Sequence, residues 1–215
     1  MDRAAPDHLP GLMPASALPN AASSPNGVAD APAWSVAALA GRLVELSGAD
    51  APAALTVAVD LVLDAQRHGE PAAWVMARES TFFPPDVAEH GVDLAALVVA
   101  RVPDAASIPR AASTLLRSGA FSLVVLDLGE EAAIPTPLQA RLVKLAQGRS
   151  TAVVCLTIKP SDAASIGSLV SLRGEARRVE TARGLFTCEV RIIKDKHQGP
   201  TWKHKEDYHG PVGLC

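Results

Sequence analysis

The chain has 215 residues, of which 48% are hydrophobic and only 4% aromatic, so aliphatic side chains must build most of its core. This composition excludes a globally disordered protein. Lys and Arg (20) nearly balance Asp and Glu (23), which argues against a protein whose affinity comes from neutralising many phosphates. Three cysteines without short spacing favour a reduced, cytoplasmic protein, and no apolar run is long enough to span a membrane.

A tail is predicted ahead of the folded part of the chain. Residues 1–33 contain six prolines among Ala, Ser, Asn and Gly and show neither helical nor alternating periodicity. Such a segment cannot bury enough apolar surface to fold alone, so it is predicted to be disordered. From Trp34 onward apolar runs begin, and we expect a core domain over residues 34–196.

Strands and helices alternate through most of this domain. The clearest buried strands are the continuous, β-branched runs at 121–128 and 152–158. Helices are expected where apolar residues recur at helical spacing between Gly or Pro residues. In chain order, the sequence predicts a strand at 42–46, a helix at 52–67, strands at 72–76 and 97–100, a helix at 108–118, a strand at 121–128, a helix at 137–147 and a strand at 152–158.

The last third of the chain has a different pattern. Segments 168–179 and 185–194 alternate polar and apolar residues and are joined near Gly184, which predicts an antiparallel hairpin. The fold prediction is therefore an α/β protein: a mostly parallel twisted sheet with flanking helices and a C-terminal antiparallel hairpin. Residues 197–215 are rich in Gly, Pro and mixed charges and are predicted to form an extended tail.

The turn between the first strand and the first helix has the setting of a phosphate-binding loop but lacks its residues. Such a loop needs G-x-x-x-x-G-K-[ST], because the second glycine lets N–H groups point inward, the lysine reaches the outer phosphates and the hydroxyl binds Mg²⁺. Only Gly48 fits this motif. Ala53 replaces the glycine, Ala54 the lysine and Leu55 the hydroxyl. The sequence therefore predicts no nucleotide cofactor, and it offers no metal site elsewhere.

An ordered series of short segments resembles the bacterial recombinase RecA. The resemblance spans about residues 36–200 at low identity and implies a RecA-like fold. It also implies that Asp127 is the remnant of the family's second nucleotide motif. The matching segments are 41–48, 65–69, 90–93, 115–120, 123–127, 172–178 and 190–196.

The departures from RecA imply binding without catalysis. Without the lysine and the hydroxyl, Asp127 has little to assist, so the chain is predicted not to be an enzyme. The segment that corresponds to RecA's mobile DNA-contacting loop is reduced to Lys159–Gly167, with a single basic residue. Direct DNA binding is therefore expected to be weak or absent, and any basic patch must be local, because the charges nearly balance.

The end of the chain combines lysines with two aromatic residues, which predicts a partner-binding element. Aromatic residues often anchor protein interfaces, and lysines speed encounter with an acidic partner. A solvated, idle tail is the alternative. The residues expected to contact a protein partner are Lys194, Lys196, Trp202, Lys203, Lys205 and Tyr208.

Among RecA-like groups without the nucleotide site, the chain most resembles the ImuA type. That resemblance implies an SOS-response accessory in damage-induced mutagenesis, which proceeds by translesion DNA synthesis. The implied partners are ImuB (an inactive Y-family polymerase homologue), RecA and, indirectly, an error-prone C-family polymerase. The alternatives are a SulA-like cell-division inhibitor that binds the tubulin-like division protein, and a residual nucleotide-binding regulator. The basic extension Lys194–Lys205 favours the first.

Overall fold

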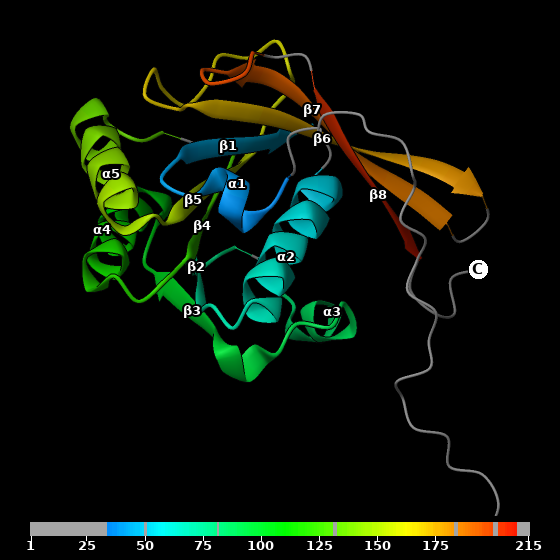
Figure 1. Cartoon of the computed structure of the whole chain (residues 1–215), viewed down its shortest axis with the longest axis horizontal. Helices are drawn as coiled ribbons and strands as arrows, with labels where there is room; N and C mark the ends of the chain where they lie inside the picture. Colours follow the sequence, from blue (N-terminus) through cyan, green and yellow to red (C-terminus); the bar gives the residue numbers. More distant parts are fainter. Residues whose placement is uncertain are drawn as a thin grey trace, which may run out of the picture. The chain divides into compact units, whose positions relative to one another are not determined.

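Eight strands form one sheet in the part of the chain that the structure describes (Figure 1). The computed structural model describes residues 34–49, 51–80, 82–130, 133–182, 185–199 and 202–209, so the predicted tail 1–33 lies outside it. The sheet order is β3-β2-β4-β5-β1-β6-β7-β8. The strands are β1 (Leu43–Gly48), β2 (Ala72–Ala77), β3 (Leu97–Val102), β4 (Leu123–Gly129), β5 (Ala152–Ile158), β6 (Leu172–Ala182), β7 (Leu185–Asp195) and β8 (Lys203–His209).

The strands from β3 to β6 pair in parallel, whereas β7 and β8 pair antiparallel. This arrangement confirms the predicted α/β fold with a mostly parallel sheet and a C-terminal antiparallel hairpin. Residues 123–126 of β4 and 152–157 of β5 are all buried. Helices cover both faces of these central strands, which is why their sequences are continuous apolar runs.

Helices divide the core into two layers. One layer lies between the sheet and α1 (Val36–Leu39) with α2 (Ala51–Arg67). The other lies between the sheet and α4 (Ile108–Ser118) with α5 (Thr136–Arg149), two helices that lie side by side in Figure 1. The short α3 (Pro84–Glu89) follows β2, and 3-10 turns occur at Leu94–Ala96 and Ala105–Ser107. Within the described ranges, no helix is both long and apolar enough to cross a membrane.

The structure corrects part of the prediction that residues 197–215 form an extended tail outside the core, of which residues 210–215 lie outside the described residues. Residues 203–209 form β8, which pairs with β7 from Leu185↔His209 to Arg191↔Lys203. The core domain, expected to end at residue 196, therefore continues to His209. The strand pattern was hidden because six of the seven residues in β8 are charged or His, and because Gly and Pro residues flank the strand in the sequence.

Candidate functional site

The turn from β1 to α2 lies at the carboxyl edge of the parallel strands, where a phosphate-binding loop would be. β1 ends at Gly48 and α2 begins at Ala51. Ala53 and Ala54 are only 1% and 4% exposed and belong to the core layer beneath α2, whereas Leu55 is 36% exposed. The side chain that stands in the lysine's place is therefore part of the apolar core.

Asp127 lies on β4 at the same edge of the sheet, separated from β1 by β5. It pairs in register with Met76 on β2 and Leu156 on β5. Burial raises the pKa of Asp127, and a hydrogen bond from the backbone of Gly129 opposes this effect. In the ranges that the structure covers, no Lys or Arg forms an ion pair with the Asp127 carboxylate.

A buried polar cluster is centred on Glu45, in the middle of β1. The Glu45 carboxylate lies 2.5 Å from Nζ of Lys159 and 3.9 Å from Nε of Arg173. Three further groups donate hydrogen bonds to it: Oγ1 of Thr157 at 3.2 Å, Oγ of Ser165 at 2.7 Å and the N–H of Ile166 at 3.0 Å. One fully buried carboxylate thus lies beside two cations: the nearly buried Arg173 and Lys159, whose side chain is 16% exposed to solvent. The carboxylate compensates part of their charge, which lowers the cost of burying Arg173.

The same cluster holds the segment between β5 and β6 against the sheet. The guanidinium of Arg173 donates hydrogen bonds to the carbonyl groups of Ala163 and Pro160. Nζ of Lys159 donates to the carbonyl of Ala164 at 2.7 Å. This is the segment that the sequence resemblance matches to RecA's DNA-contacting loop, and here three of its backbone carbonyls accept hydrogen bonds from Arg173 on β6 and from Lys159, which follows β5.

The four lysines expected to contact a partner fall into two groups. Lys194 is the next-to-last residue of β7, and Lys196 directly follows the strand. Burial, followed by the charge of Lys196, lowers the pKa of Lys194. Nζ of Lys196 donates to the carbonyl of Ser168 at 2.6 Å. Lys203 and Lys205 lie on β8, where each Nζ is 2.9 Å from a different oxygen of Glu189. The structure therefore does not bring the four lysines into a single cluster.

Trp202, which precedes β8, is a structural residue. Its ring centroid lies 6.4 Å from that of Trp34, and its indole Nε1 donates a hydrogen bond of 3.2 Å to Asp195. The prediction that no core lies near Trp202 is wrong, because the residue packs, partly buried, against the core layer beneath α2. Its contact with a partner stays a prediction.

Tyr208 is also part of the core, at 9% exposed. Its ring stacks on those of His90 and Phe186, each with a centroid distance of 5.6 Å. Its hydroxyl donates a hydrogen bond to Asp60 on α2. Like Trp202, Tyr208 anchors β8 to the domain. Tyr208 itself is not available to a partner, which corrects its predicted role.

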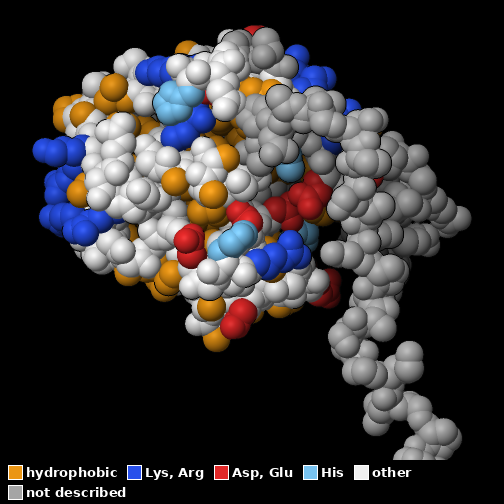
Figure 2. Space-filling view, viewed as in Figure 1, with side chains coloured by type: hydrophobic (Ala, Val, Ile, Leu, Met, Phe, Trp, Pro, Cys, Tyr) orange, Lys and Arg blue, Asp and Glu red, His pale blue; other side chains and the backbone are white. Residues whose placement is uncertain are grey.

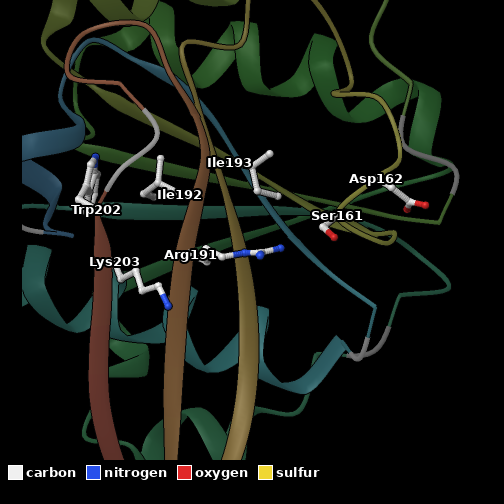
Figure 3. Close-up of a pocket in the computed structure, with 7 residues that line it drawn as sticks. All are labelled: Ser161, Asp162, Arg191, Ile192, Ile193, Trp202 and Lys203. Carbon is white, nitrogen blue, oxygen red and sulfur yellow. The ribbon is translucent and has the colours of Figure 1, made fainter.

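An open cavity of about 480 Å³ lies where β7 and β8 approach the β5–β6 segment (Figure 3). In Figure 3 the Arg191 side chain extends away from Lys203 toward the segment that carries Ser161. The Arg191 guanidinium lies 2.9 Å from Glu175, and the charge of this guanidinium is therefore already paired. The lining residues are Ser161, Asp162, Arg191, Ile192, Ile193, Trp202 and Lys203. Their mixture of paired charges and apolar side chains does not select a particular small molecule.

Sequence reasoning missed the Glu45 cluster. The available signal was a lone carboxylate inside a strand expected to be buried, because a buried acid needs a cation. Its partner Lys159 directly follows β5, and its partner Arg173 belongs to β6. Only the pairing of β1 with β5 and with β6 brings these two residues to Glu45.

Comparison with known proteins places this geometry in context. The family profile described as the RecA N-terminal domain matches residues 25–146. The chain is 27% identical to Protein RecA of Bifidobacterium breve over 203 residues, which covers 77% of this chain and 51% of that protein. For Protein RecA of Acidothermus cellulolyticus, the identity is 27% over 212 residues, covering 81% and 61%. The chain is 34% identical to Protein RecA of Nocardioides sp. over 123 residues, which covers 52% of this chain and 35% of that protein. The chain thus spans about half the length of the curated relatives it matches.

Proposed function

The chain belongs to the RecA N-terminal domain family, and on that premise we propose that it is a non-catalytic member that acts through protein contacts. Its proposed process is DNA-damage-induced mutagenesis, in which error-prone polymerases copy damaged templates in the cytoplasm. The proposal requires neither nucleotide nor metal as a cofactor.

The observation that carries the proposal is the burial of Ala54. At the position where a phosphate-binding loop presents lysine to the outer phosphates, this chain places a methyl group that is 4% exposed in the core. Loss of the lysine alone removes a charge-assisted contact worth about 1.5–3 kcal/mol. Leu55 supplies no hydroxyl for Mg²⁺ either, so two groups on which the family's phosphoryl chemistry depends are replaced by apolar side chains.

The proposed partners are an ImuB-type inactive Y-family polymerase homologue and RecA, with an error-prone C-family polymerase joined indirectly. The open face of β7 and β8 supports a role in such contacts, because Lys203 and Lys205 remain 54% and 61% exposed there. Tyr208, at 9% exposed, offers a partner little surface, whereas Trp202 is partly buried and also lines the open cavity. Rim charges of this kind mainly raise association rates.

The nucleotide part of the proposal is tested by calorimetry of the full chain with ATP and Mg²⁺. We expect no binding in the micromolar range and no rise in the unfolding temperature with ATP, because a ligand that binds the folded state stabilises it by mass action. RecA under the same conditions is the positive control. Submicromolar affinity for ATP would overturn the non-catalytic assignment.

The partner part is tested by affinity purification of the tagged chain from cells exposed to DNA damage. We expect an ImuB-type protein in the bound fraction, identified by mass spectrometry. The double variant K203E/K205E should recover less of it, whereas R67E/R78E, with the same change of charge at exposed positions elsewhere, should recover as much as the unaltered chain. Recovery of the tubulin-like division protein instead would replace the proposal with a cell-division inhibitor.

A further inference from the structure

The surface formed by α4 and α5 carries basic residues and no acidic ones. Between 108 and 118 and between 136 and 149, the sequence contains no Asp or Glu. Figure 2 shows Lys and Arg side chains gathered at the left of the molecule, where Figure 1 places α4 and α5, without acidic side chains beside them. The basic residues, all exposed, are Arg110, Arg117, Arg141, Lys144 and Arg149, and they are called here the α4–α5 basic surface.

These five charges are not neutralised within the described part of the molecule. None of them takes part in the ion pairs formed there, which use other basic residues, such as Lys159 with Glu45 and Lys203 with Glu189. Arg117 donates only to the neutral hydroxyl of Thr114, at 3.3 Å. In a chain with a net charge of −3, this surface is a concentrated positive region.

The positions of the charges are fixed by the helices. Arg110 and Arg117 lie seven residues apart, which puts them on one side of α4 at a spacing of about 10 Å. Arg141 and Lys144 are three positions apart and share one side of α5. The guanidinium of Arg149 lies close to Gly119, the residue that ends α4, so the charge at the end of α5 lies beside the end of α4.

The composition of this surface distinguishes a polyanion from a protein partner. Protein interfaces usually centre on buried aromatic or large apolar anchors. The exposed large apolar residues of the described chain are Leu55, Phe83, Leu94, Val98, Val99, Ile158 and Val179, and none lies on α4 or α5. Neither helix contains an aromatic residue on which an unpaired base could stack. Four of the five basic residues are arginines, whose planar guanidinium groups bind phosphate with two hydrogen bonds.

We propose that the α4–α5 basic surface binds the phosphate backbone of double-stranded DNA without reading its sequence. This site is separate from the β5–β6 segment, whose reduction predicted weak or absent DNA binding. Five cations allow only modest affinity, so the interaction would hold the chain near DNA while other surfaces bind its partners. The choice of DNA as the duplex rests on the proposed function in mutagenesis.

The experiment measures fluorescence anisotropy of a labelled DNA duplex with the full chain over a series of salt concentrations. We expect saturable binding at low salt, with a slope of log affinity against log salt no steeper than about −4.5, since each of five phosphate contacts contributes about −0.9. The variant R141Q/K144Q should flatten the slope by about 2 and weaken binding at least about tenfold. R110Q/R117Q should act similarly.

The matched control is R67Q/R78Q, which removes two exposed charges outside α4 and α5 and should bind like the unaltered chain. The proposal would be overturned by absence of saturable duplex binding at low salt or by equal losses in the control. Tighter binding of a single-stranded oligonucleotide or of polyglutamate than of the duplex would also overturn it. Circular dichroism confirms that each variant is folded. A negative result with DNA leaves the recovery of ImuB-type protein unaffected, so the two proposals fail separately.

Discussion

The guanidinium of Arg42, directly before β1, lies 2.6 Å from the carboxylate of Asp195 at the end of β7. Trp202 donates to the second carboxylate oxygen. Burial raises the pKa of Asp195, but hydrogen bonds from the backbone of His197, from Arg42 and from Trp202 outweigh it and hold that pKa below its usual value. This contact ties the antiparallel end of the sheet to its central strand, so the C-terminal strands belong to the folding unit.

Removing the carboxylate of Glu45 should strongly destabilise the protein. In Glu45→Gln, Lys159 and Arg173 lose the charge that compensates them, and breaking a buried ion pair costs about 3–5 kcal/mol. Urea denaturation should report this loss, and hydrogen exchange should increase over residues 159–171. Glu189→Gln is the control, because its lysine partners are exposed and such pairs contribute about 0–1 kcal/mol. Equal effects of the two substitutions would contradict this prediction.

Gly174 on β6 should not tolerate alanine. A Cβ at this position would lie 2.6 Å from Cγ1 of Val190 on β7, and a β-branched side chain has little freedom to move. Overpacking of this kind should cost about 1–3 kcal/mol in the free energy of unfolding. Gly148→Ala is the matched substitution: it lies in α5 with nothing within 4 Å and should stabilise by about 0.4–1 kcal/mol. Chemical denaturation of both variants decides the prediction, which fails if they shift stability in the same direction.

Truncating Tyr208 should show that β8 is part of the fold. Tyr208→Ala removes a ring stacked on His90 and Phe186 and should cost about 3–5 kcal/mol, as for other buried aromatic residues. Tyr208→Phe loses only the hydroxyl donor to Asp60 and should cost about 0.5–1.5 kcal/mol. Phe83→Ala, at a position 57% exposed, should cost far less than Tyr208→Ala. Thermal unfolding of the three variants provides the comparison, and an unchanged midpoint for Tyr208→Ala would show that β8 contributes nothing.

Stability should decrease as the pH rises above about 6.5, because of His90. The Nε2 atom of His90 lies 2.5 Å from the carboxylate of Asp60, and this hydrogen bond raises the pKa of His90 above 6.5. Burial lowers the pKa, whereas the negative charges of Asp60 and Glu206 raise it further. The positive charge of Arg67 lowers it slightly. A group whose pKa is raised on folding stabilises the folded state below its unfolded pKa. That contribution is lost as the pH rises through the folded pKa.

Urea midpoints measured from about pH 6 to about pH 9 test this dependence, since the window begins near the ordinary pKa of histidine. His90→Gln should remove the decline attributable to this residue. His68→Gln is the control, because His68 is exposed and has a different aspartate, Asp64, as its neighbour. An unchanged pH profile in His90→Gln would contradict the assignment.

The sequence by itself determined the parallel part of the sheet and the departures at the phosphate-binding motif. The runs that became β4 and β5 are recognisable because strands covered on both faces are apolar throughout, which is a local property. The replacement of lysine by Ala54 is equally local, because the motif depends on spacing within a few residues. Both features are visible without knowing which segments meet in space.

Only the tertiary structure decided the roles of the polar residues and of the chain's last segment. Glu45 finds Lys159 and Arg173 because β1 lies between β5 and β6. In the sequence alone, residues 203–209 look like a solvated tail, because Tyr208 is their only large apolar residue and shows no alternating pattern. Pairing with β7 places Glu189 between Lys203 and Lys205 and turns Tyr208 into the core, since neighbouring residues of a strand point to opposite faces.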